Sequence, residues 1–428
     1  MRRLYILLLC LLMLALPLGH AASAELTNYE LQLSGGLAAV SEGDTYFFAP
    51  LEDGTWGLYS VKTFESGAIV TIKDVKPARL IYADSKTVYF LGIRPDEGFI
   101  FASVDLSARA ASPVIEKLKE MYSETETTFF YVSPDDPYTM YRYSITEKKS
   151  TKIKNLTSKT MYDAGVYNKT TYLLGMDSSG GIVGYEINPR SNKAVNLSTP
   201  SPKMGDAYLF NGYIVYSQKG DSTRIYTVPV GKSKGVRLGE KISGITLSSP
   251  RYADALYPFD EATNSIVRVP LDGSATASLP LITQGQKYVI TGGTSDQILY
   301  ADDGKVYSIS PQLQNKTELF EFDINTDSMR WTALSPTNQN HVLVMGYMPI
   351  TASDIGYSLP TAVRLVDLAS RETIFQFPKL EAAAVEDPDD PDYVPPENDA
   401  YASNSSEPIV DILVDENEDV SFSDLFGN

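Results

Sequence analysis

The sequence predicts an all-β fold built from a repeated unit of four short strands. Of its 428 residues, 43% are hydrophobic, and 28 Tyr and 16 Phe provide many side chains that favour strands. A short apolar or aromatic run recurs every 41 to 44 residues. A second run follows most of these first runs and alternates apolar and polar residues, as a half-buried strand does. No helical pattern separates the repeats.

The first run of each repeat predicts a strand with both faces buried. The eight runs are centred on Phe47, Tyr89, Phe130, Tyr172, Val215, Tyr257, Leu299 and Leu343. An Asp or Asn precedes several of them, namely Asp44, Asp84, Asn168, Asn211, Asp254 and Asp296. These side chains suit a tight hairpin because they bond nearby backbone and tolerate left-handed dihedrals. We therefore expect each unit to contain a first strand, an aromatic strand, an alternating strand and an outer strand.

Four strands in about 42 residues, repeated without helices, are typical of the blades of a β-propeller. A single blade cannot bury both faces alone, whereas a closed ring of blades can. We predict eight blades, the last spanning 329–377 with a longer loop over 349–359, and seven blades as the alternative. The alternating segment Tyr29-Glu30-Leu31-Gln32-Leu33 is a candidate closing strand for the last blade, and pairing at the expense of one weak unit would give the seven-bladed alternative.

Residues 1–24 are predicted to be a signal peptide. Arg2 and Arg3 precede an apolar stretch, and Ala22-Ser23-Ala24 has the small residues at which cleavage occurs. The stretch is short for a membrane span, so an uncleaved anchor is the less favoured alternative. The only cysteine, Cys10, lies in this segment, so the exported chain has no disulfide and a single histidine.

The acidity of the protein is concentrated at one end. The chain has a net charge of −18, and residues 381–428 contain 15 acidic side chains and no Lys, Arg or His. We predict that this segment is a disordered acidic tail and that residues 25–380, with a charge of only −5, form the propeller. Charge of this sign argues against binding nucleic acid or anionic lipid.

The sixth repeat resembles a known family. Its segments Ala255-Leu256-Tyr257-Pro258-Phe259-Asp260 and Leu271-Asp272-Gly273-Ser274 resemble the repeats of low-density-lipoprotein-receptor-type (YWTD) propellers, and especially secreted bacterial proteins of unknown function. No repeat contains Tyr-Trp-Thr-Asp itself, and receptor propellers of that type have six blades. The resemblance implies a binding or scaffold role outside the cytoplasm and provides no catalytic residue.

The residues available for chemistry are few. His341 opens an apolar run and has no nucleophile motif beside it, so we interpret it as a strand-end histidine. One histidine and no thiol cannot build a zinc or copper site. The loop Asp323-Ile324-Asn325-Thr326-Asp327 begins like a calcium loop, but Ser328 and Leu334 replace its glycine and glutamate, so we predict a polar turn.

Other polar and aromatic motifs have simple structural interpretations. We interpret the sequon residues Asn155, Asn168, Asn196, Asn315 and Asn404 as turn and strand residues rather than glycosylation sites. The tyrosines permit stacking on sugars but recur at strand positions, which favours packing between blades. Residues 409–414 of the tail, or Phe422, Leu425 and Phe426, form possible docking motifs, although a solvated tail is favoured.

These observations predict an exported, non-catalytic, bacterial β-propeller in the secreted fraction or cell envelope that binds a protein or a cell-surface glycan. No catalytic, cofactor-binding or metal-ligating residue is assigned, and no cofactor is expected. One alternative is a glycan hydrolase or lyase that uses two carboxylates, whose positions the sequence does not reveal. The other is a structural envelope protein that acts through its acidic tail.

Overall fold

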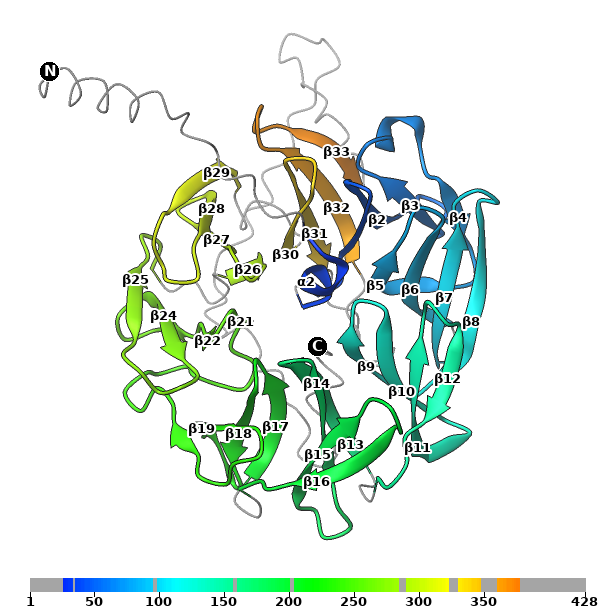
Figure 1. Cartoon of the computed structure of the whole chain (residues 1–428). Helices are drawn as coiled ribbons and strands as arrows, with labels where there is room; N and C mark the ends of the chain where they lie inside the picture. The colour runs from blue at the N-terminus through cyan, green and yellow to red at the C-terminus, as the bar shows by residue number, and fades with distance from the viewer. Residues whose placement is uncertain are drawn as a thin grey trace, which may run out of the picture.

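The chain folds as an eight-bladed β-propeller, as the repeats predict (Figure 1). The computed structural model describes residues 26–33, 35–94, 98–156, 160–200, 204–284, 290–322, 330–347 and 360–377. Each blade is an antiparallel sheet formed by consecutive strands, and the blades follow one another around a ring. The predicted signal peptide and acidic tail lie outside the described residues.

The strands of the first four blades have the following bounds. Blade 1 contains β1 (Ala38–Ser41), β2 (Asp44–Pro50), β3 (Trp56–Ser60), the short 3₁₀ helix η1 (Phe64–Ser66) and β4 (Val70–Ile72). Blade 2 contains β5 (Lys76–Ala83), β6 (Thr87–Arg94), β7 (Gly98–Asp105) and β8 (Ala110–Leu118). Blade 3 contains β9 (Glu120–Thr125), β10 (Thr128–Ser133), β11 (Asp136–Ser144) and β12 (Lys149–Lys152). Blade 4 contains β13 (Thr160–Tyr167), β14 (Thr170–Met176), β15 (Ile182–Asn188) and β16 (Lys193–Leu197).

The other four blades complete the ring. Blade 5 contains β17 (Met204–Phe210), β18 (Tyr213–Gln218), β19 (Asp221–Pro229) and β20 (Val236–Arg237). Blade 6 contains β21 (Arg251–Tyr252), β22 (Ala255–Leu256), β23 (Phe259–Asp260), β24 (Ser265–Pro270) and β25 (Ala277–Pro280). Blade 7 contains β26 (Ile290–Gly293), β27 (Ile298–Asp302), β28 (Lys305–Ile309) and β29 (Thr317–Glu321). Blade 8 contains β30 (Arg330–Pro336), β31 (His341–Tyr347), β32 (Pro360–Asp367) and β33 (Thr373–Phe377).

The aromatic run of each repeat forms the second strand of its blade. In β10, for example, Phe129 to Val132 are all buried, and Phe130 lies opposite Tyr122 of β9 and Arg142 of β11. The polar residues before two of these strands adopt the expected left-handed backbone, with φ of 49° at Asn168 and 45° at Asn211. Blade 6 departs from the pattern because its second strand is interrupted between β22 and β23 at Tyr257 and Pro258. Proline lacks the N–H that a continuous ladder needs.

Large side chains pack between neighbouring blades and hold the ring together. The cluster between blades 2 and 3 contains Ile81, Tyr89, Phe101, Leu118, Phe129, Tyr131, Tyr143 and Ile145. The cluster between blades 1 and 8 includes Phe47 and Val40 from blade 1 with Leu343 and Leu365 from blade 8. The ring is closed here by side-chain packing between two complete sheets, because each blade consists only of consecutive strands.

The predicted closing strand at residues 29–33 is wrong. These residues belong to the α-helix α2 (Asn28–Leu33), which lies inside the ring (Figure 1). Thr27 and Glu30 form a capping box: Glu30 Oε2 accepts from Thr27 N at 3.0 Å, and Thr27 Oγ1 accepts from Glu30 N at 3.3 Å. The helix ends at Leu33 and is followed by Gly35 and Gly36, which have φ of 98° and 67°; Gly36 N donates to Leu31 O. Local capping thus overrides the alternating pattern.

Helix α2 is attached to several blades. Asn28 is buried; its Nδ2 donates to Val40 O and Ala83 O, and its Oδ1 accepts from Val40 N at 2.7 Å. Asn28 N also donates to Glu126 Oε1 at 3.0 Å, and just before the helix Leu26 N donates to Asn338 Oδ1 at 3.1 Å. These contacts place the helix at the end of the ring where first and second strands are joined.

Candidate functional site

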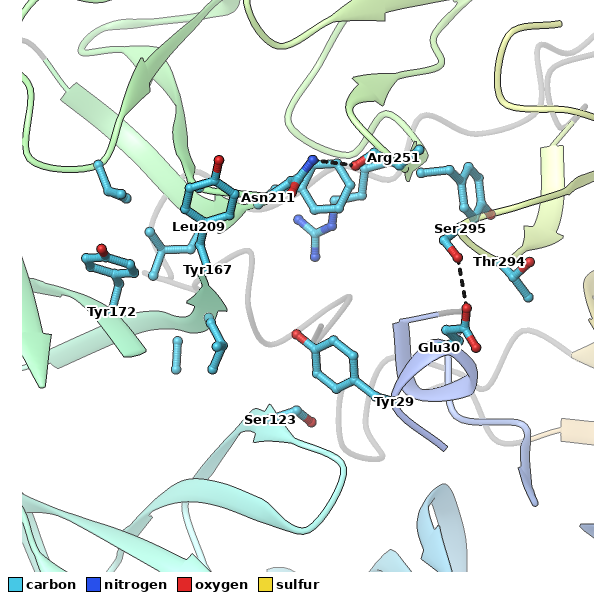
Figure 2. Close-up of a pocket in the computed structure, with 18 of the residues that line it drawn as sticks. Tyr29, Glu30, Ser123, Tyr167, Tyr172, Leu209, Asn211, Arg251, Thr294 and Ser295 are labelled. Carbon is cyan, nitrogen blue, oxygen red and sulfur yellow. Dashed lines mark hydrogen bonds between the residues drawn. The ribbon is translucent and has the colours of Figure 1, made fainter. Parts of the chain in front are cut away.

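A pocket of about 190 Å³ lies beside helix α2 inside the ring (Figure 2). We call it the α2 pocket. Side chains from the helix and from blades 3 to 7 line it, and those with polar or aromatic groups are Tyr29, Glu30, Ser123, Tyr167, Tyr172, Phe210, Asn211, Arg251, Tyr252, Thr294 and Ser295. No blade forms the pocket alone, because each contributes only the end of its first strand, the following turn or a neighbouring strand residue.

The lining residues come from equivalent places in successive repeats. Tyr167 ends β13, Asn211 follows β17, and Arg251 and Tyr252 form β21. The turn residues Thr294 and Ser295 follow β26. Because the blades are related by the ring, these positions converge at the same end, where α2 also lies. The pocket therefore follows from the repeat together with the helix inside the ring.

Arg251 provides the positive charge of the pocket. Its guanidinium carbon lies 4.2 Å from the centroid of the Tyr208 ring and 5.9 Å from that of Phe210. Aromatic faces at these distances attract a cation and hold its planar group in place. Among the residues that the structure describes, Arg251 makes no ion pair with a carboxylate. Figure 2 shows the guanidinium and the ring of Tyr29 pointing into the same space.

Hydrogen bonds fix the rim of the pocket. Ser295 Oγ donates to Glu30 Oε1 at 2.8 Å, which joins blade 7 to helix α2. Asn211 Nδ2 donates to Ala253 O at 2.9 Å, which joins the turns of blades 5 and 6. Both bonds are drawn in Figure 2. The rim therefore presents hydroxyl and amide groups that are already oriented by the fold.

Burial controls the protonation of the tyrosines near Arg251. Burial raises the pKa of Tyr208 to about 12, although the positive charge of Arg251 opposes this. Burial also raises the pKa of Tyr29, and the carboxylate of Asp163 raises it further. Asp163 is buried and accepts from Leu209 N at 2.6 Å, which connects blades 4 and 5 beside the pocket. Near neutral pH both phenols therefore remain neutral hydroxyls.

The residues considered for chemistry from the sequence lie elsewhere. His341 opens β31 as predicted, and its Nε2 lies 3.2 Å from Asp367 Oδ2, but it does not line the α2 pocket. Residues 323–328 of the calcium-like loop lie outside the described residues, and Leu334 is buried in β30. The sequon residues Asn155, Asn168 and Asn315 have positive φ, and Asn196 lies on β16. The last sequon residue, Asn404, lies outside the described residues. So do the two docking motifs of the tail, at 409–414 and at Phe422, Leu425 and Phe426.

His341 makes stability depend on pH. Burial lowers its pKa below the ordinary value of 6.5, although Asp367 opposes this shift. Below pH 6.5 the unfolded state therefore binds more protons at this site, so acid destabilises the folded protein. We expect the thermal midpoint to fall more between pH 7.5 and 5 in the native protein than in His341→Gln. The pKa of Asp367 is also lowered, but its protonation changes stability only at more acidic pH. Equal pH dependence in both proteins would contradict this prediction.

Within the described ranges, no three His, Cys, Asp or Glu side chains are grouped as metal ligands would be. No helix in this part of the chain is both long and apolar enough to cross a membrane.

Comparisons with known proteins concern the fold. No protein-family model and no curated protein matches the chain. A prolyl endopeptidase structure is similar at 13% identity and a TM-score of 0.46, over 79% of this chain and 56% of that one, so this chain spans little more than half of its length. The β-propeller domain of the Trilobed protease from Pyrococcus furiosus is similar at 10% identity and a TM-score of 0.40, over 68% and 95%. Protein lmo1340 from Listeria monocytogenes EGD-e is similar at 12% identity and a TM-score of 0.42, over 70% and 94%.

The sequence interpretation assigned none of the lining residues to a site. A signal was present for Tyr29 and Glu30, since Thr27 and Glu30 have capping-box spacing and Gly35-Gly36 follows. Arg251 has no such signal. Its position depends on the packing of Tyr208 and Phe210, which lie in the preceding blade.

Proposed function

We propose that this protein is an exported, non-catalytic β-propeller that binds a cell-surface polymer through the α2 pocket. The observation that carries the proposal is the convergence of side chains from five blades and helix α2 around one pocket. Tyrosine faces, hydroxyls and an amide line it, which suits recognition of a polar ligand with apolar faces. The resemblance of the sixth repeat to YWTD-type repeats of secreted bacterial proteins supports a binding role outside the cytoplasm.

A glycan is favoured over a protein surface by the size and lining of the pocket. With a volume of about 190 Å³, the pocket admits a group of the size of one sugar residue or one side chain, whereas a folded surface does not enter it. The pocket contains one carboxylate among its described lining residues, Glu30, which Ser295 already engages. A glycosidase needs two carboxyl groups across the scissile bond. This lining therefore favours binding over cleavage.

The test is a binding screen with the exported full chain. We expect at least one envelope polysaccharide to bind and its affinity to fall about tenfold or more in Tyr29→Ala and Tyr167→Ala, because each ring offers a large contact face and a loss of about 1.4 kcal/mol is a tenfold change in affinity. Tyr138→Ala is the matched control, since Tyr138 is 78% exposed and does not line the pocket. Each variant is compared with the native protein by circular dichroism to verify folding.

Three outcomes would contradict the proposal. Turnover of a polysaccharide that is lost with a single Asp or Glu substitution would favour the carboxylate enzyme. Binding that depends on residues 381–428 but is unaffected by the pocket variants would favour action through the acidic tail. A screen in which no envelope polysaccharide binds would remove the proposed function altogether.

A further inference from the structure

The two charged residues of the α2 pocket differ in what they already bind. Glu30 is occupied: its Oε1 accepts from Ser295 Oγ at 2.8 Å, and its Oε2 accepts from Thr27 N at 3.0 Å and Thr27 Oγ1 at 2.9 Å. Arg251 has no carboxylate partner among the described residues. The negative charge of the pocket is therefore engaged in the structure, whereas the positive charge is available to a ligand.

The surroundings of Arg251 favour a planar anion. Its guanidinium is held over the Tyr208 ring at 4.2 Å, and the side chain is only partly exposed. Holding the group in advance reduces the entropy lost when a ligand binds. A guanidinium presents N–H groups in a fork that matches both oxygens of a carboxylate, and partial burial strengthens such a contact. With a neutral ligand, the guanidinium would keep its aromatic contacts and would have no carboxylate partner among the described residues.

The remaining lining groups indicate which ligand features, besides a carboxylate, the pocket can bind. Tyr29 faces Arg251 across the pocket and offers an aromatic face (Figure 2). Tyr167, 38% exposed, lies on the same wall as Tyr172. Asn211 and Thr294 contribute an amide and a hydroxyl at the rim. Tyrosine faces suit the apolar C–H face of a sugar ring, and amides and hydroxyls match its hydroxyl groups.

We propose that the α2 pocket binds a carboxylated sugar residue of a polymer, a uronate, with Arg251 contacting its carboxylate. This inference rests on the proposed function and specifies the chemical class of its ligand. The volume of the pocket suits direct recognition of about one sugar residue.

The experiment compares oligosaccharides that differ only in charge. Oligomers ending in glucuronate, galacturonate or mannuronate are titrated into the exported full chain, each beside its carboxyl-reduced neutral counterpart. We expect at least one uronate to bind about 10- to 100-fold more tightly than its counterpart, the range for hydrogen bonds to a charged group. Arg251→Gln should remove this preference, because it weakens binding of the uronate much more than binding of its neutral counterpart. Arg251→Lys should restore only part of it, because an ammonium lacks the planar fork.

Controls separate loss of the ligand contact from loss of the fold. Arg224→Gln is the matched variant, since Arg224 lies on β19, pairs with Asp221 at 2.9 Å and does not line the pocket. It should bind like the native protein. The preference for the uronate should also weaken as salt concentration rises.

The outcomes distinguish failure of this inference from failure of the proposed function. Equal binding of acidic and neutral oligomers, lost in Tyr29→Ala, would overturn the inference and leave the proposed function in place. Binding of a peptide with a free terminal carboxylate, but of no uronate, would also overturn it. Absence of binding to every oligomer, acidic or neutral, would count against both.

Discussion

Replacement of Phe101 by alanine is expected to lower the free energy of unfolding by about 3–5 kcal/mol. Phe101 lies on β7, is 0% exposed, and belongs to the cluster between blades 2 and 3. Its ring centroid is 4.7 Å from that of Phe129, 5.7 Å from that of Tyr89 and 5.8 Å from that of Tyr143. Alanine would leave a cavity bounded by rings from two blades, which cannot close without separating them.

Urea unfolding followed by tryptophan fluorescence and circular dichroism measures the effect. The control is Tyr138→Ala on the neighbouring blade, which removes a 78% exposed ring and should change stability by less than about 0.5 kcal/mol. A loss in Phe101→Ala no greater than in this control would show that the interblade cluster does not hold blades 2 and 3 together.

Replacement of Asn28 by alanine is expected to release helix α2 from the ring and to lower stability by roughly 2–4 kcal/mol. The Asn28 side chain makes three hydrogen bonds to the backbone of blades 1 and 2: to Val40 N at 2.7 Å, to Val40 O at 2.8 Å and to Ala83 O at 3.3 Å. Alanine satisfies none of them, and buried polar groups without partners are costly.

Release of helix α2 is expected to have a second effect, on ligand binding and proteolysis, which is measured separately from stability. Tyr29 and Glu30 line the α2 pocket, so a detached helix should also weaken ligand binding and expose the segment to limited proteolysis. Tyr138→Ala serves as the control, because Tyr138 is 78% exposed and does not line the pocket. Unchanged proteolysis and stability in Asn28→Ala would show that other contacts hold the helix.

Most of the fold was predictable because its hydrogen bonds are local in sequence. Each blade pairs strands that are consecutive, for example β13 with β14 and β14 with β15. The residues that specify such a hairpin, a buried aromatic run and a turn former such as Asn168, therefore lie within one repeat. Eight repeats predicted eight blades, and the alternative of seven is wrong.

Closure and the helix were not predictable from the same pattern. The segment at 29–33 alternates like a strand, yet the capping residues Thr27 and Glu30 and the glycines that follow make it helical. Closure uses contacts such as Phe47 with Phe375, whose ring centroids are 5.6 Å apart. The residues around Phe47 in the sequence do not indicate that it contacts Phe375, and those around Phe375 do not indicate Phe47.

The sequence alone predicted the all-β architecture and the repeat and favoured eight blades over seven, because these depend on residues within about 42 positions of one another. Only the tertiary structure decided where the α2 pocket lies and which charges meet there. Ser295 reaches Glu30 across 265 positions of the chain, whereas Arg251 lies over aromatic rings and pairs with no carboxylate of the described residues. The physical reason is ring closure, which brings the same turn of distant repeats to one end and so creates a site that no single repeat encodes.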